Sequence, residues 1–153
     1  MKGQTLVELL LGISIVGIIL SGITVVVVSS LGNASYGKNQ SLATQYAQEG
    51  AEITRTIRNS DYNGFAGYNS TYCLDKGAVS LGSPGTCTTP NIDNTFIRSV
   101  KIENTASAGR CAANVSRATV IVSWKDGQCS TGSYCHKSQI ISCLSTVNPI
   151  QAP

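Results

Sequence analysis

The sequence predicts an α+β protein in which one long N-terminal α-helix packs on a small antiparallel β-sheet, with disulfide bonds stabilising the head that contains the sheet. Three observations support this fold class. No proline precedes Pro84, so one helix of roughly 80 Å, at about 1.5 Å per residue, can run from about Thr5 to Asn59. Segments typical of β-strands follow residue 94, and all six cysteines lie at or beyond Cys73.

The first element is an apolar segment long enough to cross a membrane. Residues 9–28 read LLLGISIVGIILSGITVVVV, and no charged side chain occurs between Glu8 and Lys38. A bilayer core about 30 Å thick needs roughly 20 helical residues, so we expect residues 4–31 to form a single membrane-spanning helix. A cleaved secretory signal is the alternative, since Lys2 precedes the segment, but the apolar core of such signals spans only about 7–15 residues.

Glu8 is unusual at the edge of this segment. A carboxylate there costs on the order of 2–3 kcal/mol or more in lipid unless another group pairs with it. A membrane helix that carries such a group usually does so for a functional reason. The alternative is a juxtamembrane glutamate without a partner.

The residues around Glu8 carry a resemblance to a known family. Residues 2–10 read KGQTLVELL, which resembles the N-terminal signature of type IV prepilins and pseudopilins: a short basic leader ending in Gly, an apolar residue, and then Thr-Leu-Ile-Glu-Leu or a near variant. The chain departs from the signature in two ways, because Gln4 stands where Phe is usual and the leader of residues 1–3 is short. The resemblance implies cleavage between Gly3 and Gln4 by prepilin peptidase, followed by methylation of the Gln4 amine.

The resemblance also implies a role for Glu8. In this family the corresponding glutamate neutralises the terminal amine of a neighbouring subunit in the filament. After the cut, the Gln4 amine and the Glu8 carboxylate would lie four residues apart and close together on a helix. Burying two opposite charges together removes most of the penalty that each would bear alone, so we expect Glu8 to select the register during assembly.

Residues 32–59 are expected to continue the helix as an amphipathic half, with Gly32 and Gly37 as weak points. Apolar residues recur there at helical spacing, and the charged residues fall mainly on the other side, where Glu52 and Arg55 can pair across one turn. The apolar set that should lie on the sheet is Leu42, Tyr46, Ile53 and Ile57, with Ala43, Ala47 and Ala51 beside them. Residues 42–59 also resemble a stretch of PilV-like minor pilins, which favours a minor over a major subunit.

Residues 60–93 are rich in Gly, Asn, Ser and Pro, as is typical of an ordered loop between the helix and the sheet. Cys73 and Cys87 are neighbours in this segment, and a bond between them would tie the loop down. Closing a loop of about 15 residues is worth roughly 3 kcal/mol in the chain-entropy model. Free or metal-binding thiols in a cytosolic protein are the alternative, but no CxxC pair occurs.

Residues 94–153 are expected to form the head, an antiparallel sheet followed by a short tail. Strands are predicted over residues 95–103, 118–124 and 137–144, and the Asp-Gly pair within residues 125–128 predicts a hairpin turn. In the second strand one face is apolar: Ala118, Val120, Val122 and Trp124. Cys129 and Cys135 can close a hairpin loop, which leaves Cys111 and Cys143 as a longer-range pair, although six cysteines allow 15 pairings.

No catalytic, cofactor or metal site is expected. The chain contains one histidine, His136, which we expect to be a surface residue at the edge of the loop between Cys129 and Cys135. There is no Gly-rich phosphate loop and no set of residues typical of a catalytic triad. The sequence therefore predicts a protein that is not an enzyme.

The favoured function is that of a structural subunit, a minor pilin or pseudopilin of a type IV pilus or a type II secretion-like filament. The partners implied are prepilin peptidase, other pilin subunits and the inner-membrane assembly platform. The implied location is the bacterial inner membrane, with the N-terminus in the cytoplasm and the head outside, and then the pilus or cell surface.

Two alternatives remain open. The head could be a pilus-tip adhesin or a DNA-uptake receptor, with phosphate contacts from basic residues: Arg98, Lys101, Arg110, Arg117 and Lys125. Nucleic acid is the less favoured partner because no base-stacking aromatic residues accompany these side chains. The chain could also be a single-span, membrane-anchored extracytoplasmic protein, including an enzyme, that is unrelated to pili.

Overall fold

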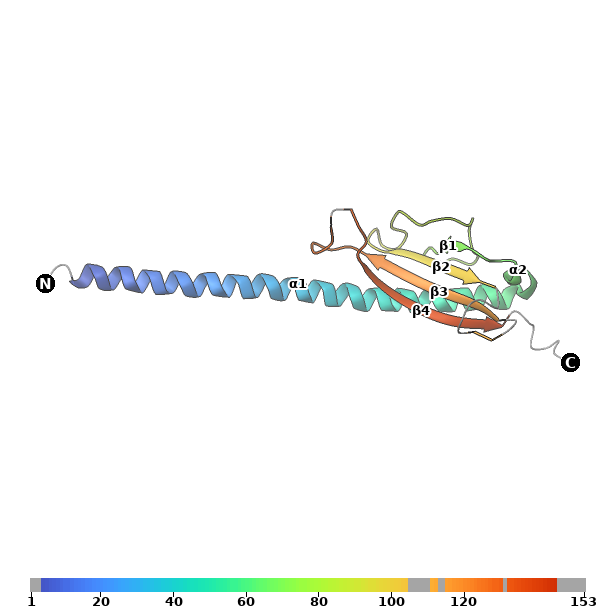
Figure 1. Cartoon of the computed structure of the whole chain (residues 1–153), viewed down its shortest axis with the longest axis horizontal. Helices are drawn as coiled ribbons and strands as arrows, with labels where there is room; N and C mark the ends of the chain where they lie inside the picture. The colour runs from blue at the N-terminus through green and yellow to red at the C-terminus, as the bar shows by residue number, and fades with distance from the viewer. Residues whose placement is uncertain (1–3, 105–110, 113–114, 131, 146–153) are drawn as a thin grey trace. The chain divides into compact units, whose positions relative to one another are not determined.

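The computed structural model describes residues 4–104, 111–112, 115–130 and 132–145 (Figure 1). In chain order the elements are α1 (Gln4–Ser60), α2 (Tyr62–Ala66), β1 (Thr71–Cys73), β2 (Ile97–Glu103), β3 (Val115–Trp124) and β4 (His136–Ser145). The internal contacts divide the chain into two units, Met1–Lys38 and Asn39–Pro153. The fold is α+β, with a long apolar N-terminal helix, an antiparallel sheet and disulfide bonds.

The first unit consists of the N-terminal part of α1, which is apolar and exposed. Its large hydrophobic side chains from Leu6 to Leu31 all lie in the open, and Ile18 has 72% of its surface exposed. By length and composition, this helix contains a stretch that can cross a membrane. Three of its hydroxyl groups bond within the helix: those of Ser14 and Thr24 donate to the carbonyl oxygens four residues earlier, and that of Ser21 donates to the one three residues earlier.

The second unit contains a four-stranded antiparallel sheet in the order β1-β2-β3-β4, so each strand pairs with its neighbour in the sequence. Ile97 lies opposite Ser123 in the β2–β3 pair, and Trp124 lies opposite His136 in the β3–β4 pair. The three strands expected from residue 95 onward are β2, β3 and β4. The predicted apolar face of β3 is confirmed, since Ala118, Val120, Val122 and Trp124 are all buried.

Residues 60–93 contain two short elements, α2 and β1, that were not predicted from the sequence pattern. The Asp61 side chain accepts a hydrogen bond from the Gly64 N–H (2.8 Å) and caps α2. β1 is only three residues long, and it joins the edge of the sheet by pairing Tyr72 with Val100. A strand of this length is too short to show an alternating pattern.

The part of α1 within the second unit, from Asn39 to Ser60, packs on one face of the sheet (Figure 1). The expected apolar side of the helix does face the sheet, but its centre consists of small residues. Leu42, Tyr46 and Ile53 are only half-buried and flank a fully buried line. This line is made of Ala43, Ala47, Gly50, Ala51 and Thr54.

Gly50 shows why small residues occupy the centre of the helix–sheet contact. A Cβ atom added at Gly50 would lie 2.8 Å from Val120 Cγ1 and 3.1 Å from Arg98 Cδ. Thr54, one turn later, donates its hydroxyl hydrogen bond to the Gly50 carbonyl oxygen (2.7 Å) and is thereby satisfied although it is buried. The helix backbone can therefore approach the sheet closely only where side chains are small.

The described residues contain three disulfide bonds: Cys73–Cys87, Cys129–Cys135 and the longer-range pair Cys111–Cys143, which encloses Cys129–Cys135 in the sequence. These are the pairs that the sequence favoured among the possible pairings. The first closes the loop after β1, and the second closes the connection between β3 and β4. The third joins β4 to residue 111. Together they constrain the loops of the second unit outside its helix–sheet core.

Candidate functional site

The first candidate site lies on α1 around Glu8. The helix begins at Gln4, whose side chain lies outside the described residues, as does the whole of Gly3. The Glu8 side chain is exposed, and it is the only charged side chain between residues 4 and 37. Residues 4 and 8 lie one helical turn apart on the same side of the helix, so a terminal amine at residue 4 would be a near neighbour of the carboxylate.

Beside Glu8, α1 presents a shallow apolar groove. It is lined by Glu8, Leu9, Gly12, Ile13 and Val16. Gly12 provides no side chain to the groove, and a Cβ atom added there would have no other atom within 4 Å. The carboxylate therefore lies at the end of an open depression whose other walls are apolar.

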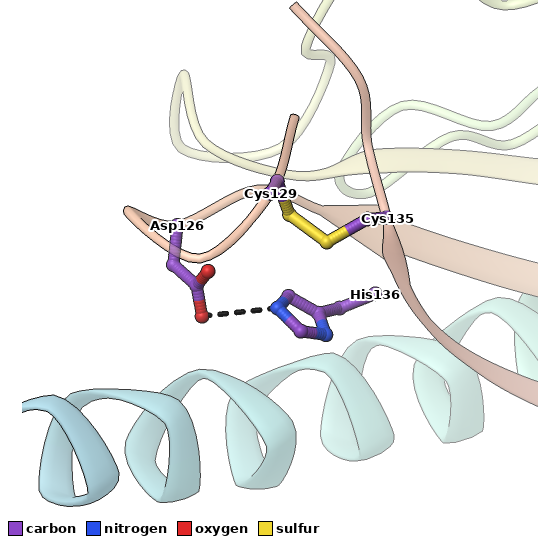
Figure 2. Close-up of side chains that lie close together, drawn as sticks. All are labelled: Asp126, Cys129, Cys135 and His136. Carbon is purple, nitrogen blue, oxygen red and sulfur yellow. Dashed lines mark ion pairs between the residues drawn. A yellow bond between two sulfur atoms is a disulfide. The ribbon is translucent and has the colours of Figure 1, made fainter. Parts of the chain in front are cut away.

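The second candidate site is a polar cluster at the connection between β3 and β4 (Figure 2). The His136 ring stacks on the Trp124 ring, with centroids 5.4 Å apart, and its Nε2 atom lies 3.0 Å from Asp126 Oδ2. The Gln128 N–H donates a hydrogen bond to Asp126 Oδ1 (2.9 Å). This bond, with a smaller contribution from His136, holds the pKa of Asp126 below its ordinary value.

Asp126, Cys129, Cys135 and His136 offer one possible ligand atom each, all within 4.8 Å of one another. The two sulfur atoms are bonded to each other, so they cannot act as thiolate ligands in this state (Figure 2). In this state the cluster stabilises the loop between β3 and β4. Asp126 at the start of the loop contacts His136 at its end, and the Cys129–Cys135 disulfide closes the loop.

His136 is placed differently from the sequence-based expectation. It lies at the edge of the cysteine-bound loop, as predicted, but its side chain is only 20% exposed and is packed between an aromatic ring and a carboxylate. The spacing Asp126-x2-Cys129-x5-Cys135-His136 was the only available signal in the sequence. It becomes informative only once the strand register places Trp124 opposite His136.

The basic residues considered for phosphate contacts are mostly engaged within the second unit. Arg98 has no exposed surface, so the expectation that it contacts phosphate is wrong.

Arg117 donates hydrogen bonds to Glu103 from Nε (2.9 Å) and Nη2 (2.6 Å), and Lys101 lies 3.0 Å from the same carboxylate. Arg117, and then Lys101, lower the pKa of Glu103. Lys125 lies over the Tyr134 ring, and Arg110 falls outside the described residues.

Arg98 instead organises the core, a role that the sequence did not reveal. Its Nε donates to the Leu74 carbonyl oxygen (2.9 Å) and its Nη2 to that of Asp75 (2.7 Å). Its Nη1 donates to the Tyr46 carbonyl oxygen (3.0 Å) and lies 3.3 Å from Glu49 Oε2. One side chain from β2 thus ties α1 to the loop that follows β1.

The fold and these sites define a class: an α+β protein whose described residues include one candidate membrane span, a carboxylate at the start of that span, and a sheet whose loops are closed by disulfides. Comparison with known proteins finds no matching protein-family model, no similar curated protein and no similar solved structure.

Proposed function

We propose that this chain is a structural subunit, a minor pilin or pseudopilin, of a type IV pilus or type II secretion-like filament. It is made as a prepilin, cut between Gly3 and Gln4, methylated at the Gln4 amine and assembled through α1. The observation that carries the proposal is Glu8, a lone exposed carboxylate at the start of an apolar helix, within the motif KGQTLVELL.

The physical argument begins with the cost of leaving Glu8 unpaired. A single carboxylate in a membrane helix costs on the order of 2–3 kcal/mol or more, and no positively charged side chain follows it before Lys38. A cut before Gln4 creates a positive amine one helical turn away. The same carboxylate and the amine of an adjacent subunit can then neutralise each other inside a filament core, where both would otherwise be costly.

The rest of α1 supports this function. A helix that packs among identical or related helices must be apolar around most of its circumference, and its polar groups must be satisfied internally. The large side chains from Leu6 to Leu31 are exposed on all sides of the helix. The hydroxyl groups of Ser14, Ser21 and Thr24 are bonded to the helix's own backbone.

The proposed partners and location follow from this assembly. Prepilin peptidase acts on the leader at the cytoplasmic face of the inner membrane, and the assembly platform then brings the chain together with other pilin subunits. The second unit lies outside the membrane, where its three disulfides are stable, and finally at the pilus or cell surface. A role as DNA receptor is not favoured, because Arg98 is buried and Arg117 is paired with Glu103.

The direct test is the variant Gly3→Ala, expressed as the full chain in its native host. We expect prepilin peptidase to fail on this variant, because the residue before the cut can no longer fit as Gly does. Intact-mass analysis of membrane-extracted protein should show the leader still attached. The matched control Gly17→Ala should be cut like the wild type.

A wild-type chain that keeps residues 1–3 in the membrane would contradict the proposal and favour a single-span anchored protein unrelated to pili. Mature Gly3→Ala protein that begins at Gln4 would contradict the prediction that the cut requires Gly3.

A further inference from the structure

The cluster at the connection between β3 and β4 has the composition of a zinc site. It combines a carboxylate, two cysteines and a histidine: Asp126, Cys129, Cys135 and His136. One possible ligand atom from each residue lies within 4.8 Å of all the others. Zn²⁺ in structural sites takes four such ligands in a tetrahedron, and its bonds of about 2.0–2.3 Å place the ligand atoms about 3–4 Å apart. The cluster is therefore within about 1 Å of the separations that a zinc site requires.

We propose that this cluster binds one Zn²⁺ when its two cysteines are reduced, and that formation of the Cys129–Cys135 disulfide releases the ion. The four ligands are the two thiolates, the His136 imidazole and the Asp126 carboxylate. The metal and the disulfide exclude each other, because each uses both sulfur atoms. This inference goes beyond the proposed function and does not depend on it.

The two ligands without sulfur already face each other. His136 Nε2 lies 3.0 Å from Asp126 Oδ2, close to the separation of about 3.3 Å between a nitrogen and an oxygen bound to one Zn²⁺. The Gln128 N–H donates to Asp126 Oδ1 (2.9 Å) and fixes the carboxylate from its other oxygen. The His136 ring stacks on the buried Trp124, with centroids 5.4 Å apart. Such outer contacts are what orient the ligands of established metal sites, so this half of the site is formed in advance.

The two cysteines approach this pair from the two ends of one loop. Cys129 follows the turn that begins at Asp126, whose carbonyl oxygen accepts a hydrogen bond from the Cys129 N–H (3.2 Å), and Cys135 directly precedes His136. Their Cα atoms are 5.5 Å apart, and Figure 2 shows the disulfide beside the Asp126–His136 pair. Once the bond between the sulfur atoms is broken, each sulfur can turn about its Cα–Cβ bond toward the imidazole and the carboxylate. Binding then releases the two thiol protons, since the thiolate is the ligand.

The types of ligand select the metal. Ca²⁺ and Mg²⁺ require oxygen ligands, which make up only one of the four groups here. Two thiolates with an imidazole are typical of Zn²⁺. Among the residues that the structure describes, neither Cys73–Cys87 nor Cys111–Cys143 lies in a comparable group of ligands.

The change from the metal-bound to the disulfide form balances with another disulfide, RSSR, as the oxidant. The Cys129 thiolate attacks RSSR and expels one RS⁻, and the Cys135 thiolate then attacks the Cys129 sulfur and expels the second RS⁻. Two electrons pass to RSSR, and Zn²⁺ leaves because both thiolate ligands are gone. A newly made chain carries thiols, and six cysteines allow 15 pairings. A bound ion would keep Cys129 and Cys135 together and away from the other four cysteines until they are oxidised.

The experiment uses the purified full chain in detergent, with Zn²⁺ alone as the ligand. A water-soluble phosphine reduces the disulfides: it takes an oxygen atom from water, and the two hydrogens go to the two sulfur atoms. After the phosphine is removed without oxygen, Zn²⁺ is added and the bound metal is measured by mass spectrometry. The reduced chain should hold one Zn²⁺ and the oxidised chain none. Co²⁺ in its place should give the visible bands of a tetrahedral site, and oxidised glutathione should release one Zn²⁺ per chain.

Two double variants identify the cysteines. Cys129→Ser/Cys135→Ser should lose the bound Zn²⁺ in the reduced state. The matched control Cys73→Ser/Cys87→Ser also lacks one disulfide, but it should still hold one Zn²⁺ when reduced. Binding that persists in the first variant, or that disappears from the control, would overturn the assignment to this loop.

The other two ligands are tested by His136→Ala and Asp126→Asn. Each should weaken Zn²⁺ binding by at least about tenfold, since even the loss of an outer contact of a metal ligand costs about 10–100-fold. Near-ultraviolet circular dichroism checks that the surroundings of Trp124 are retained. Unchanged affinity in both variants would show that Zn²⁺ binds any pair of thiols and would overturn the inference. A reduced wild-type chain that binds no Zn²⁺ would overturn it as well, because metal binding and loop closure should support each other.

Discussion

Arg98 and Glu8 are ionisable side chains that differ in their surroundings: Arg98 is buried, whereas Glu8 is exposed on an apolar helix. The Arg98 guanidinium has no exposed surface, but its nitrogens donate to three carbonyl oxygens and one of them lies 3.3 Å from Glu49. A buried charge is tolerated when its hydrogen bonds and its ion pair are complete. No such set of partners surrounds Glu8 among the described residues of its unit, and this fits the proposal that its partner is the amine of another subunit.

The first prediction at the residue scale concerns Glu8→Ala. We expect this variant to be cut normally, because the peptide bond before Gln4 is unchanged, and to enter filaments about tenfold less than the wild type, equivalent to about 1.4 kcal/mol of lost pairing. Sheared filaments and the membrane fraction are compared by immunoblotting. The control is Glu52→Ala, which removes an exposed glutamate whose ion pair with Arg55 lies at the surface.

Incorporation of Glu8→Ala at the wild-type level would rule out the charge-pairing role. A variant that stays uncut would show that Glu8 acts earlier, in recognition by the peptidase.

At the residue scale, the two candidate sites differ in how visible they are in the sequence. Gly3, Gln4 and Glu8 lie within six residues of one another, so a linear motif is enough to propose them as a site, which stays a prediction. Asp126 and His136 come together only through the register of β3 and β4, and Asp126 alone looks like an ordinary turn residue. The core role of Arg98 was also hidden, because its partners are carbonyl oxygens of segments far away in the sequence.

At the scale of elements, the fit between α1 and the sheet depends on the small residues along the helix. The predicted stripe of Leu42, Tyr46, Ile53 and Ile57, with three alanines beside it, does lie on the sheet. The alanines and Ile57 are buried, whereas Leu42, Tyr46 and Ile53 are only half-buried, and the buried Gly50 was not in the predicted set. Helical periodicity identifies which side of a helix is apolar, but not how closely that side approaches its neighbour. The close approach depends on the packing of Val120, which no local pattern in α1 can reveal.

Gly50→Val tests this contact. The added side chain would overlap Val120 and should lower the free energy of unfolding by about 1–3 kcal/mol, the usual cost of overpacking a core. Thermal unfolding of the full chain in detergent, followed by near-ultraviolet circular dichroism, measures the change. Gly37→Val is the control, because a Cβ atom there has no neighbour within 4 Å.

Equal unfolding temperatures for Gly50→Val and the wild type would show that the helix can lift from the sheet at little cost. A loss of stability in Gly37→Val as large as that in Gly50→Val would instead point to the helix itself.

At the scale of the whole molecule, the two units differ in the groups that they use. The described part of the first unit carries one carboxylate and otherwise exposes mainly apolar side chains. The second unit is held by a buried core, by disulfides and by carboxylates whose pKa values are lowered: Asp93, Glu103 and Asp126. These two sets of interactions should respond differently to pH.

The acid stability of the second unit is therefore predictable in sign. A carboxyl group whose pKa is lowered by folding stabilises the fold above its ordinary pKa, and that contribution is lost as the pH falls through the lowered value. The hydrogen bond from Tyr46 is the main cause at Asp93, the Arg117 bonds at Glu103 and the Gln128 N–H at Asp126. We expect the unfolding temperature to be level from about pH 5 upward and to fall below about pH 4, near the ordinary pKa values of these side chains.

The three carboxylates lie at different junctions, so acid should loosen the second unit as a whole. Asp93 links the loop before β2 to α1 through Tyr46, Glu103 links β2 to β3 through Arg117, and Asp126 holds the connection from β3 to β4. Above about pH 5, Glu103→Gln should lower the free energy of unfolding by about 0.2–1 kcal/mol, as expected for loss of a partly exposed ion pair. Below about pH 4, the unfolding temperature of this variant should fall less steeply with pH than that of the wild type. Unfolding is followed by near-ultraviolet circular dichroism between pH 3 and pH 8. If the unfolding temperature of Glu103→Gln falls as steeply below pH 4 as that of the wild type, Glu103 does not contribute to acid unfolding, and Asp93 and Asp126 must account for it.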